Sequence, residues 1–187
     1  MRQRLGRCLL RLVGWRIAGE LPSHGTYVAI AAPHTSDWDL PLGLMAAAAF
    51  GVKISWLGKD ALFRWPLGRL MRRLGGIPVH RDRSEGVVRQ AAEALAAADS
   101  LILAITPEGT RSPTAFWRSG FYHIASAAGV PIFPVYIDRP TRHIGAGPAI
   151  YPSGDLHRDM DLIRGFYAGR QGIRPANAGA IRLREEN

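Results

Sequence analysis

From Thr26 to Asp138 the chain alternates short apolar runs with longer runs that have helical periodicity. This alternation is typical of an α/β domain, in which helices pack on the faces of a sheet. We expect strands at residues 27–31, 53–57, 77–80, 101–105 and 132–137. We expect helices between them at residues 40–50, 63–74, 85–98 and 115–128, the last stopped by Gly129. The tail has weaker signals for a strand at 149–151 and a helix at 160–167. The expected fold class is therefore α/β, a single domain with a mixed central β-sheet flanked by helices.

The N-terminal segment has a different character. Its first 20 residues scatter arginines among leucines, together with Trp15 and Ile17, which predicts a basic amphipathic helix. Such a helix can lie on a bilayer surface with its arginines toward the headgroups, or it can pack on the domain that follows. Both interpretations fit the sequence. We assign residues 1–25 to an amphipathic membrane-surface helix and residues 26–187 to the main domain.

The charge balance narrows the possible partners. The chain has 24 Lys and Arg against 15 Asp and Glu, a net charge of +9, which favours phosphate groups, nucleic acid or acidic lipid surfaces. No helix-turn-helix, zinc-finger or ribonucleoprotein motif is visible, so we do not expect nucleic acid. The longest apolar stretch, residues 42–52, is much shorter than the roughly 20 residues of a membrane-spanning helix. A single cysteine, Cys8, excludes an intrachain disulfide and suits a reducing compartment.

A first polar turn, residues 32–39, follows the strand expected at 27–31 and leads into a helix. His34 would lie at the carboxyl end of that strand, where open α/β sheets commonly carry their sites. Histidine can accept a proton near neutral pH, and a carboxylate such as Asp39 can orient its ring. Asp37 is a rival for that role. A capping box from Ser36 to Asp39 is the structural alternative, although Pro41 favours a later helix start.

A second polar turn, residues 106–112, follows the strand expected at 101–105. Gly109 would let the backbone approach a ligand closely, and the planar fork of Arg111 suits phosphate oxygens. Thr110 adds a hydroxyl. The alternative is a solvated turn in which Glu108 and Arg111 form a salt bridge. Between the two turns, Arg81 closes a short strand and could join Arg111 in a basic floor for a phosphate.

These segments together resemble a known family. From about residue 26 to 138, the chain is similar to the lysophosphatidate acyltransferases, also called 1-acylglycerol-3-phosphate acyltransferases. Four segments carry the resemblance in the right order. They are the His-x4-Asp pair His34 and Asp39, the block from Lys59 to Arg81, the turn from Glu108 to Ser112, and the apolar run from Val130 to Val135. Many members have an acidic residue before the arginine of the second block, where this chain has His80, which leaves the identity of the acceptor open.

The resemblance implies an acyltransferase domain over residues 26–187 and a reaction without an acyl-enzyme. His34, aligned by Asp39, would deprotonate the free hydroxyl of a lysophospholipid for attack on an acyl-coenzyme A or acyl carrier protein thioester. Lysophosphatidate is the first expected acceptor, with another lysolipid or a glycolipid as the alternative. The resemblance implies that the acceptor is bound by Lys59, Arg81, Glu108, Gly109, Thr110 and Arg111.

The expected partners are therefore the lysophospholipid, the thioester donor and a membrane surface. No cofactor and no metal are expected, because no Cys or His cluster has ligand spacing. The expected location is the cytoplasmic face of a membrane, as a peripheral or monotopic protein. A non-catalytic basic membrane-binding module is one rival, supported by the charge of +9. A serine hydrolase is a weaker rival, since the chain has no Gly-x-Ser-x-Gly segment.

Overall fold

The computed structural model describes residues 2–79 and 84–186. Within these residues, the strands form a seven-stranded sheet in the order β1-β7-β6-β2-β5-β3-β4. The strands are β1 (Arg16–Ala18), β2 (Thr26–Ala32), β3 (Ile54–Lys59), β4 (Gly76–Val79), β5 (Leu101–Ile105), β6 (Ile132–Asp138) and β7 (His143–Ala146). Neighbouring strands are parallel except β6 and β7, which are antiparallel. The predicted mixed sheet is confirmed.

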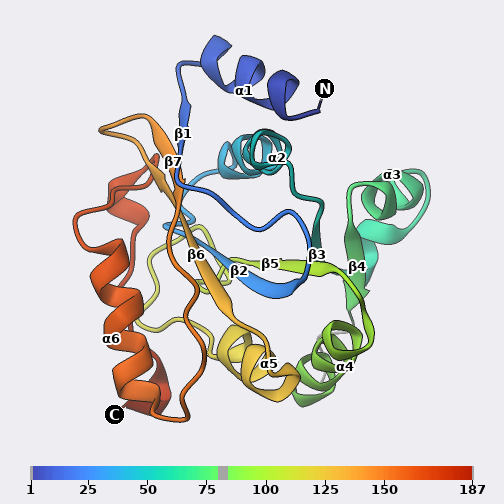
Figure 1. Cartoon of the computed structure of the whole chain (residues 1–187), viewed down its shortest axis with the longest axis vertical. Coiled ribbons are helices and arrows are strands. Elements are labelled where there is room, and N and C mark those ends of the chain that lie inside the picture. The colour runs from blue at the N-terminus through green and yellow to red at the C-terminus, as the bar shows by residue number, and fades with distance from the viewer. Residues whose placement is uncertain (1, 80–83, 187) are drawn as a thin grey trace.

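Helices cover both faces of this sheet (Figure 1). On one face lie α1 (Arg2–Leu12) and α2 (Asp39–Phe50). On the other lie α4 (Ser84–Ala97), α5 (Gly120–Ala128) and α6 (Leu156–Tyr167). The connection from β3 to β4 contains the short helices η1 (Asp60–Phe63) and α3 (Gly68–Arg73), and the tail ends with η2 (Pro175–Asn177) and η3 (Arg184–Glu186). The α/β class predicted from the sequence is thus confirmed.

Strand β2 lies at the centre of the sheet and is hydrogen-bonded to β5 on one side and β6 on the other. Its Val28 and Ile30 pack into the core beneath α4, α5 and α6. Its Tyr27 and Ala29 pack into a second core beneath α1 and α2. Burial on both faces explains why this strand is almost continuously apolar. The carboxyl end of β2 is therefore held firmly between two neighbouring strands.

Two helices are shorter than the sequence predicts. The helix expected at residues 63–74 is divided into η1 and α3, with Pro66 between them. Proline lacks the backbone donor that a continuous helix needs, and it restricts the residue before it. The helix expected at 115–128 begins only at Gly120, because the Trp117 N–H donates to the Arg182 carbonyl at 2.8 Å. The predicted stop at Gly129 is confirmed, with φ at 66°.

The N-terminal helix ends at Leu12, earlier than expected, and residues 16–18 join the sheet as β1, which the sequence did not predict. Helix α1 buries Gly6 and Leu10. A Cβ on Gly6 would come within 2.5 Å of the Ala49 nitrogen, so the backbones of α1 and α2 nearly touch. The helix therefore packs on the domain, while Leu5, Leu9 and Leu12 stay exposed. The division of the chain at residue 25 stays a prediction.

The tail after β6 is more ordered than the sequence suggests. Strand β7 was not predicted, and the strand expected at 149–151 is reduced to an isolated bridge between Ile150 and Ile132. The helix expected at 160–167 begins earlier as α6, where the Asp155 carboxylate accepts the Arg158 N–H. In the part of the chain described here, no helix has the length and apolar content needed to cross a membrane.

Candidate active site

The two polar turns predicted from the sequence lie side by side. Strands β2 and β5 are adjacent and parallel, with Ile30 opposite Ile105, so the segments that follow them leave the same edge of the sheet. The first polar turn, residues 33–39, ends at Asp39, the first residue of α2, and Pro41 lies in the first turn of that helix as predicted. Residues 106–112 form the second turn. The parallel pairing is the reason that residues more than 70 positions apart can meet.

His34 lies in the first turn and its ring is oriented by Asp39. The ring Nδ1 is 3.0 Å from Asp39 Oδ2, and the His34 and Asp39 side chains are only 16% and 4% exposed. A carboxylate oxygen only accepts hydrogen bonds, so the tautomer that fits this contact has its proton on Nδ1 and its lone pair on Nε2. The structure therefore brings together the two residues that the sequence predicted as a pair, in the geometry of an oriented base.

Asp39 also organises the backbone of its own turn. The same Oδ2 accepts the N–H of Thr35 at 2.7 Å and that of Ser36 at 2.9 Å. The bond from Ser36 is half of the capping box considered as the structural alternative, so the carboxylate serves both purposes. Thr35 and Ser36 are themselves buried. With three donors on one oxygen, the carboxylate holds the turn and the imidazole as one unit.

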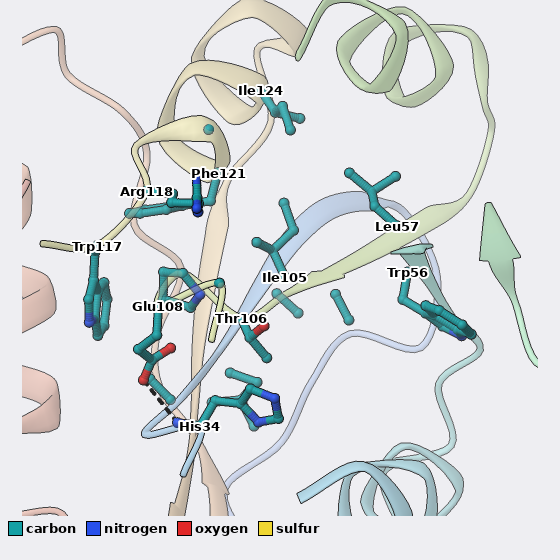
Figure 2. A pocket seen from close by; sticks show the side chains of 18 of the residues that line it. His34, Trp56, Leu57, Ile105, Thr106, Glu108, Trp117, Arg118, Phe121 and Ile124 are labelled. Carbon is teal, nitrogen blue, oxygen red and sulfur yellow. Dashed lines mark hydrogen bonds between the residues drawn. The ribbon is translucent and has the colours of Figure 1, made fainter. Parts of the chain in front are cut away.

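Glu108 connects the second turn to the first. Its Oε1 accepts the backbone N–H of His34 at 2.9 Å, as the dashed line in Figure 2 shows. Burial raises the pKa of the Glu108 carboxyl above its ordinary value of 4.5, against an opposing effect of the His34 N–H. The second oxygen, Oε2, is buried without a hydrogen-bond partner within the described residues. The alternative of a salt bridge between Glu108 and Arg111 is wrong, because the carboxylate is turned inward to the His34 backbone.

Arg111 pairs instead with Asp37, through Nη1 and Oδ1 at 2.5 Å. Both side chains are largely exposed, at 54% and 79%. Asp37 is therefore not the residue that orients His34, and the alternative that gave it this role is wrong. Thr110 accepts the Ser112 N–H at 3.2 Å, and Thr110 and Arg111 both line the cavity described below.

Two further predicted residues belong to the connection between β3 and α4. Lys59 ends β3 and pairs in register with Val79, which places its backbone at the carboxyl end of a parallel strand. Its side chain lies outside the residues that the structure describes, and so does the whole of Arg81. The acceptor-binding roles that the resemblance implies for Lys59 and Arg81 stay predictions.

A large cavity of about 2030 Å³ opens beside the two turns. His34, Asp39, Thr106, Glu108, Thr110 and Arg111 line its polar end. Mostly apolar side chains line the remainder, from α2 and β3 on one side and from α4 and α5 on the other, together with a few charged residues such as Arg89, Glu93 and Arg118. Figure 2 shows Ile105, Leu57 and Ile124 beyond the ring of His34. The cavity thus combines a compact polar end with a long apolar wall, which suits a molecule that has a polar head and a hydrocarbon chain.

A model of the acyltransferase family matches residues 16–138, which is more than half of the 187 residues. The chain belongs to the acyltransferase family. This match confirms the resemblance seen in the four sequence segments. Among curated proteins, no sequence match was found.

The fold of this family member is also similar to a solved structure. The crystal structure of the 1-acyl-sn-glycerophosphate acyltransferase PlsC from Thermotoga maritima matches with a TM-score of 0.59 and 16% sequence identity. The match covers 88% of this chain and 76% of that chain. At this identity the likeness supports the architecture, namely the mixed sheet with helices on both faces.

The sequence prediction did not single out Arg118, a cation at the site of this acyltransferase family member. Arg118 lies just before α5 and lines the same cavity as His34. Its position was predicted to be the interior of a helix, which gave no reason to single it out. No sequence signal pointed to it, because its place depends on a contact with Gly109 in another segment of the chain. Among the described residues, no group of three or more His, Cys, Asp or Glu could hold a metal ion.

Proposed function

We propose that this chain transfers a fatty acyl group from acyl-coenzyme A or acyl carrier protein to the free hydroxyl of a lysophospholipid. The first acceptor to test is 1-acylglycerol 3-phosphate, which would give phosphatidate. The observation that carries the proposal is the His34 Nδ1 contact with Asp39 Oδ2 at 3.0 Å, beside a cavity with a polar end and apolar walls. Membership of the acyltransferase family supports the reaction class.

His34 acts as a general base in the proposed reaction. Its Nε2 takes the proton of the acceptor hydroxyl while the oxygen forms a bond to the thioester carbonyl carbon. The tetrahedral species then collapses, the carbon–sulfur bond breaks, and the leaving thiolate takes the proton from Nε2. Asp39 stabilises the imidazolium that exists between these two steps, because its carboxylate faces Nδ1–H. A base held in this way contributes on the order of 10² to 10⁴ in rate.

Glu108 has a positioning role in this scheme. Its carboxylate holds the backbone N–H of His34 at 2.9 Å and thereby fixes where the ring enters the cavity. Arg111, Thr110 and Gly109 remain candidates for binding the acceptor phosphate, as the resemblance implies. For Arg111 this role requires that a phosphate compete with Asp37 for the guanidinium.

The decisive experiment measures release of the donor thiol in the presence and absence of lysolipid. We expect wild-type protein to release thiol only when lysophosphatidate is present, and His34→Ala to lose this activity while folding normally. His157→Ala, which changes an exposed histidine of α6, is the matched control and should behave as wild type. If His34→Ala turned over at the wild-type rate, the role of His34 would be refuted. Thiol release without any acceptor would instead favour a hydrolase.

We also propose that α1 contacts a membrane surface. Leu5, Leu9 and Leu12 are spaced four and three residues apart, so they form one exposed stripe on the helix. Exposed arginines lie beside this stripe on the same helix, and they suit anionic headgroups. The buried face of α1, with Gly6 and Leu10, is occupied by the domain. An apolar stripe with arginines beside it is the pattern of a helix that lies in the interface.

Sedimentation with vesicles tests this surface. We expect Leu12→Ser to weaken binding to vesicles that contain anionic lipid, because it removes an apolar side chain that is 77% exposed. The matched control is Leu162→Ser, which changes a 54% exposed leucine on α6. Equal binding by the two variants would contradict a specific role of α1.

A further inference from the structure

Arg118 approaches the candidate active site across Gly109. A Cβ on Gly109 would lie 2.6 Å from the Arg118 Nε and 2.9 Å from its Cδ, so the arginine side chain rests directly over this glycine. Gly109 also has φ at 65°, a conformation that favours glycine. The sequence predicted that Gly109 would let a ligand approach the backbone. In the structure, the group that approaches it is the stem of Arg118.

The backbone of Arg118 is fixed from two directions. Its N–H donates to the Pro107 carbonyl at 2.8 Å, which ties it to the turn after β5. The preceding residue, Trp117, is buried and donates its N–H to the Arg182 carbonyl at 2.8 Å. Figure 2 shows Arg118 beside Phe121 at the start of α5, on the side of the cavity where Glu108 lies. The charge is therefore held at a defined place near the polar end of the cavity.

Arg118 differs from Arg111 in its electrostatic partners. Arg111 is paired with Asp37. In the portion of the chain that the structure describes, no carboxylate lies within ion-pair distance of Arg118, and its side chain is exposed to the cavity. A guanidinium offers a planar set of donors that matches the oxygens of a phosphate. The first amides of α5 add the positive end of a helix next to it.

We propose that Arg118 binds the phosphate group of one of the two substrates. This inference rests on the proposed acyl transfer. The phosphate could belong to the acceptor, as a phosphomonoester on glycerol, or to the donor, as the phosphate on the pantetheine arm. Both present the same chemistry to the guanidinium. Arg118 binds and positions its substrate, and it takes no proton in the reaction.

Paired substrates with and without the phosphate separate the two sources. The acceptor pair is 1-palmitoylglycerol 3-phosphate and 1-palmitoylglycerol. The donor pair is S-palmitoyl-4′-phosphopantetheine and S-palmitoyl-pantetheine. For each pair, the ratio of the kcat/KM values measures how much the enzyme gains from the phosphate. We expect Arg118→Gln to lower one of these ratios by about tenfold to a hundredfold, the range for a lost charge-assisted hydrogen bond.

Two further variants make the result specific. Arg118→Lys keeps the charge without the planar fork, so it should restore part of the lost ratio. Arg158→Gln removes an exposed arginine of α6 that does not line the cavity, and both of its ratios should equal those of wild type.

Each outcome has one meaning. A fall in the acceptor ratio assigns Arg118 to the acceptor phosphate, and a fall in the donor ratio assigns it to the donor. Unchanged ratios in both Arg118→Gln and Arg118→Lys would overturn the inference while leaving the acyl transfer intact. If wild-type protein transferred no acyl group to any of these acceptors, the proposed function itself would fail.

Discussion

The two turns that carry the candidate site occupy similar positions in the fold, but their side chains bind different partners. Each follows a buried parallel strand, and each contains a buried carboxylate. In the first turn, Asp39 binds donors from residues 34–36, all within its own turn. In the second turn, the two charged side chains bind groups in the first turn: Glu108 binds the His34 backbone and Arg111 binds Asp37.

This difference suggests that one turn positions the base and the other binds substrate. The first turn is held by one carboxylate of its own, and Glu108 fixes the His34 N–H from the second turn, which suits a group that must meet a proton at a fixed point. A turn whose side chains reach outward depends on its neighbours, and its arginine can exchange a weak exposed partner for a ligand. We infer that residues 33–39 hold the chemistry in place and that residues 106–112 connect this chemistry to substrate binding.

The largest effect is expected from Asp39→Ala. It removes the acceptor of three hydrogen bonds, two of them from buried backbone N–H groups. We expect acyl transfer to fall by on the order of 10² to 10⁴. We also expect the free energy of unfolding to fall by about 2–3 kcal/mol, because buried donors lose their partner. Steady-state kinetics and urea denaturation measure the two effects. Loss of activity with unchanged stability would show that the first turn does not depend on this carboxylate.

A smaller effect is expected from Glu108→Gln. Burial raises the pKa of the Glu108 carboxyl, so the folded state binds its proton more tightly than the unfolded state does. Its contribution to the free energy of unfolding therefore declines as pH rises from about 4.5 through the raised folded pKa.

Glutamine can still accept the His34 N–H but does not titrate. Between pH 4.5 and pH 7.5, the wild-type protein loses the stabilising contribution of Glu108, whereas the variant has no such contribution to lose. We therefore expect the free energy of unfolding to fall less over this pH range in the variant than in the wild type. Urea denaturation at both pH values checks it. An identical pH dependence in both proteins would mean that Glu108 keeps its ordinary pKa.

The smallest effect is expected at the exposed pair of the second turn. A double-mutant cycle with Asp37→Asn and Arg111→Gln should give a coupling free energy below about 1 kcal/mol, because both side chains are more than half exposed. Thermal or urea denaturation of the four proteins measures it. A coupling of several kcal/mol would place this pair with the rigid first turn and remove the contrast between the two.

The features predicted correctly from the sequence are those fixed by local pattern. The apolar runs predicted the positions of β2, β5 and β6. The contact between His34 and Asp39 was predictable because the two residues are five positions apart in one turn. Pro41 correctly favoured the later start of α2.

The features that were missed depend on residues distant in the chain. Strand β1 has only three residues and exists because it pairs with β7, far along the chain. The start of α5 is set by a bond from Trp117 to the tail. The partner of Arg111 lies in the other turn, and the place of Arg118 depends on Gly109. No periodicity or composition encodes such contacts.

The close contact at Gly6 couples the positions of α1 and α2. Ala48 and Ala49 of α2 lie within 3 Å of where a Cβ on Gly6 would be, and Leu40 and Leu44 of the same helix line the cavity. Because backbone meets backbone there, α1 cannot slide without carrying α2 with it. A displacement of the outer helix would thus be passed to α2 and to the leucines that α2 places along the cavity wall.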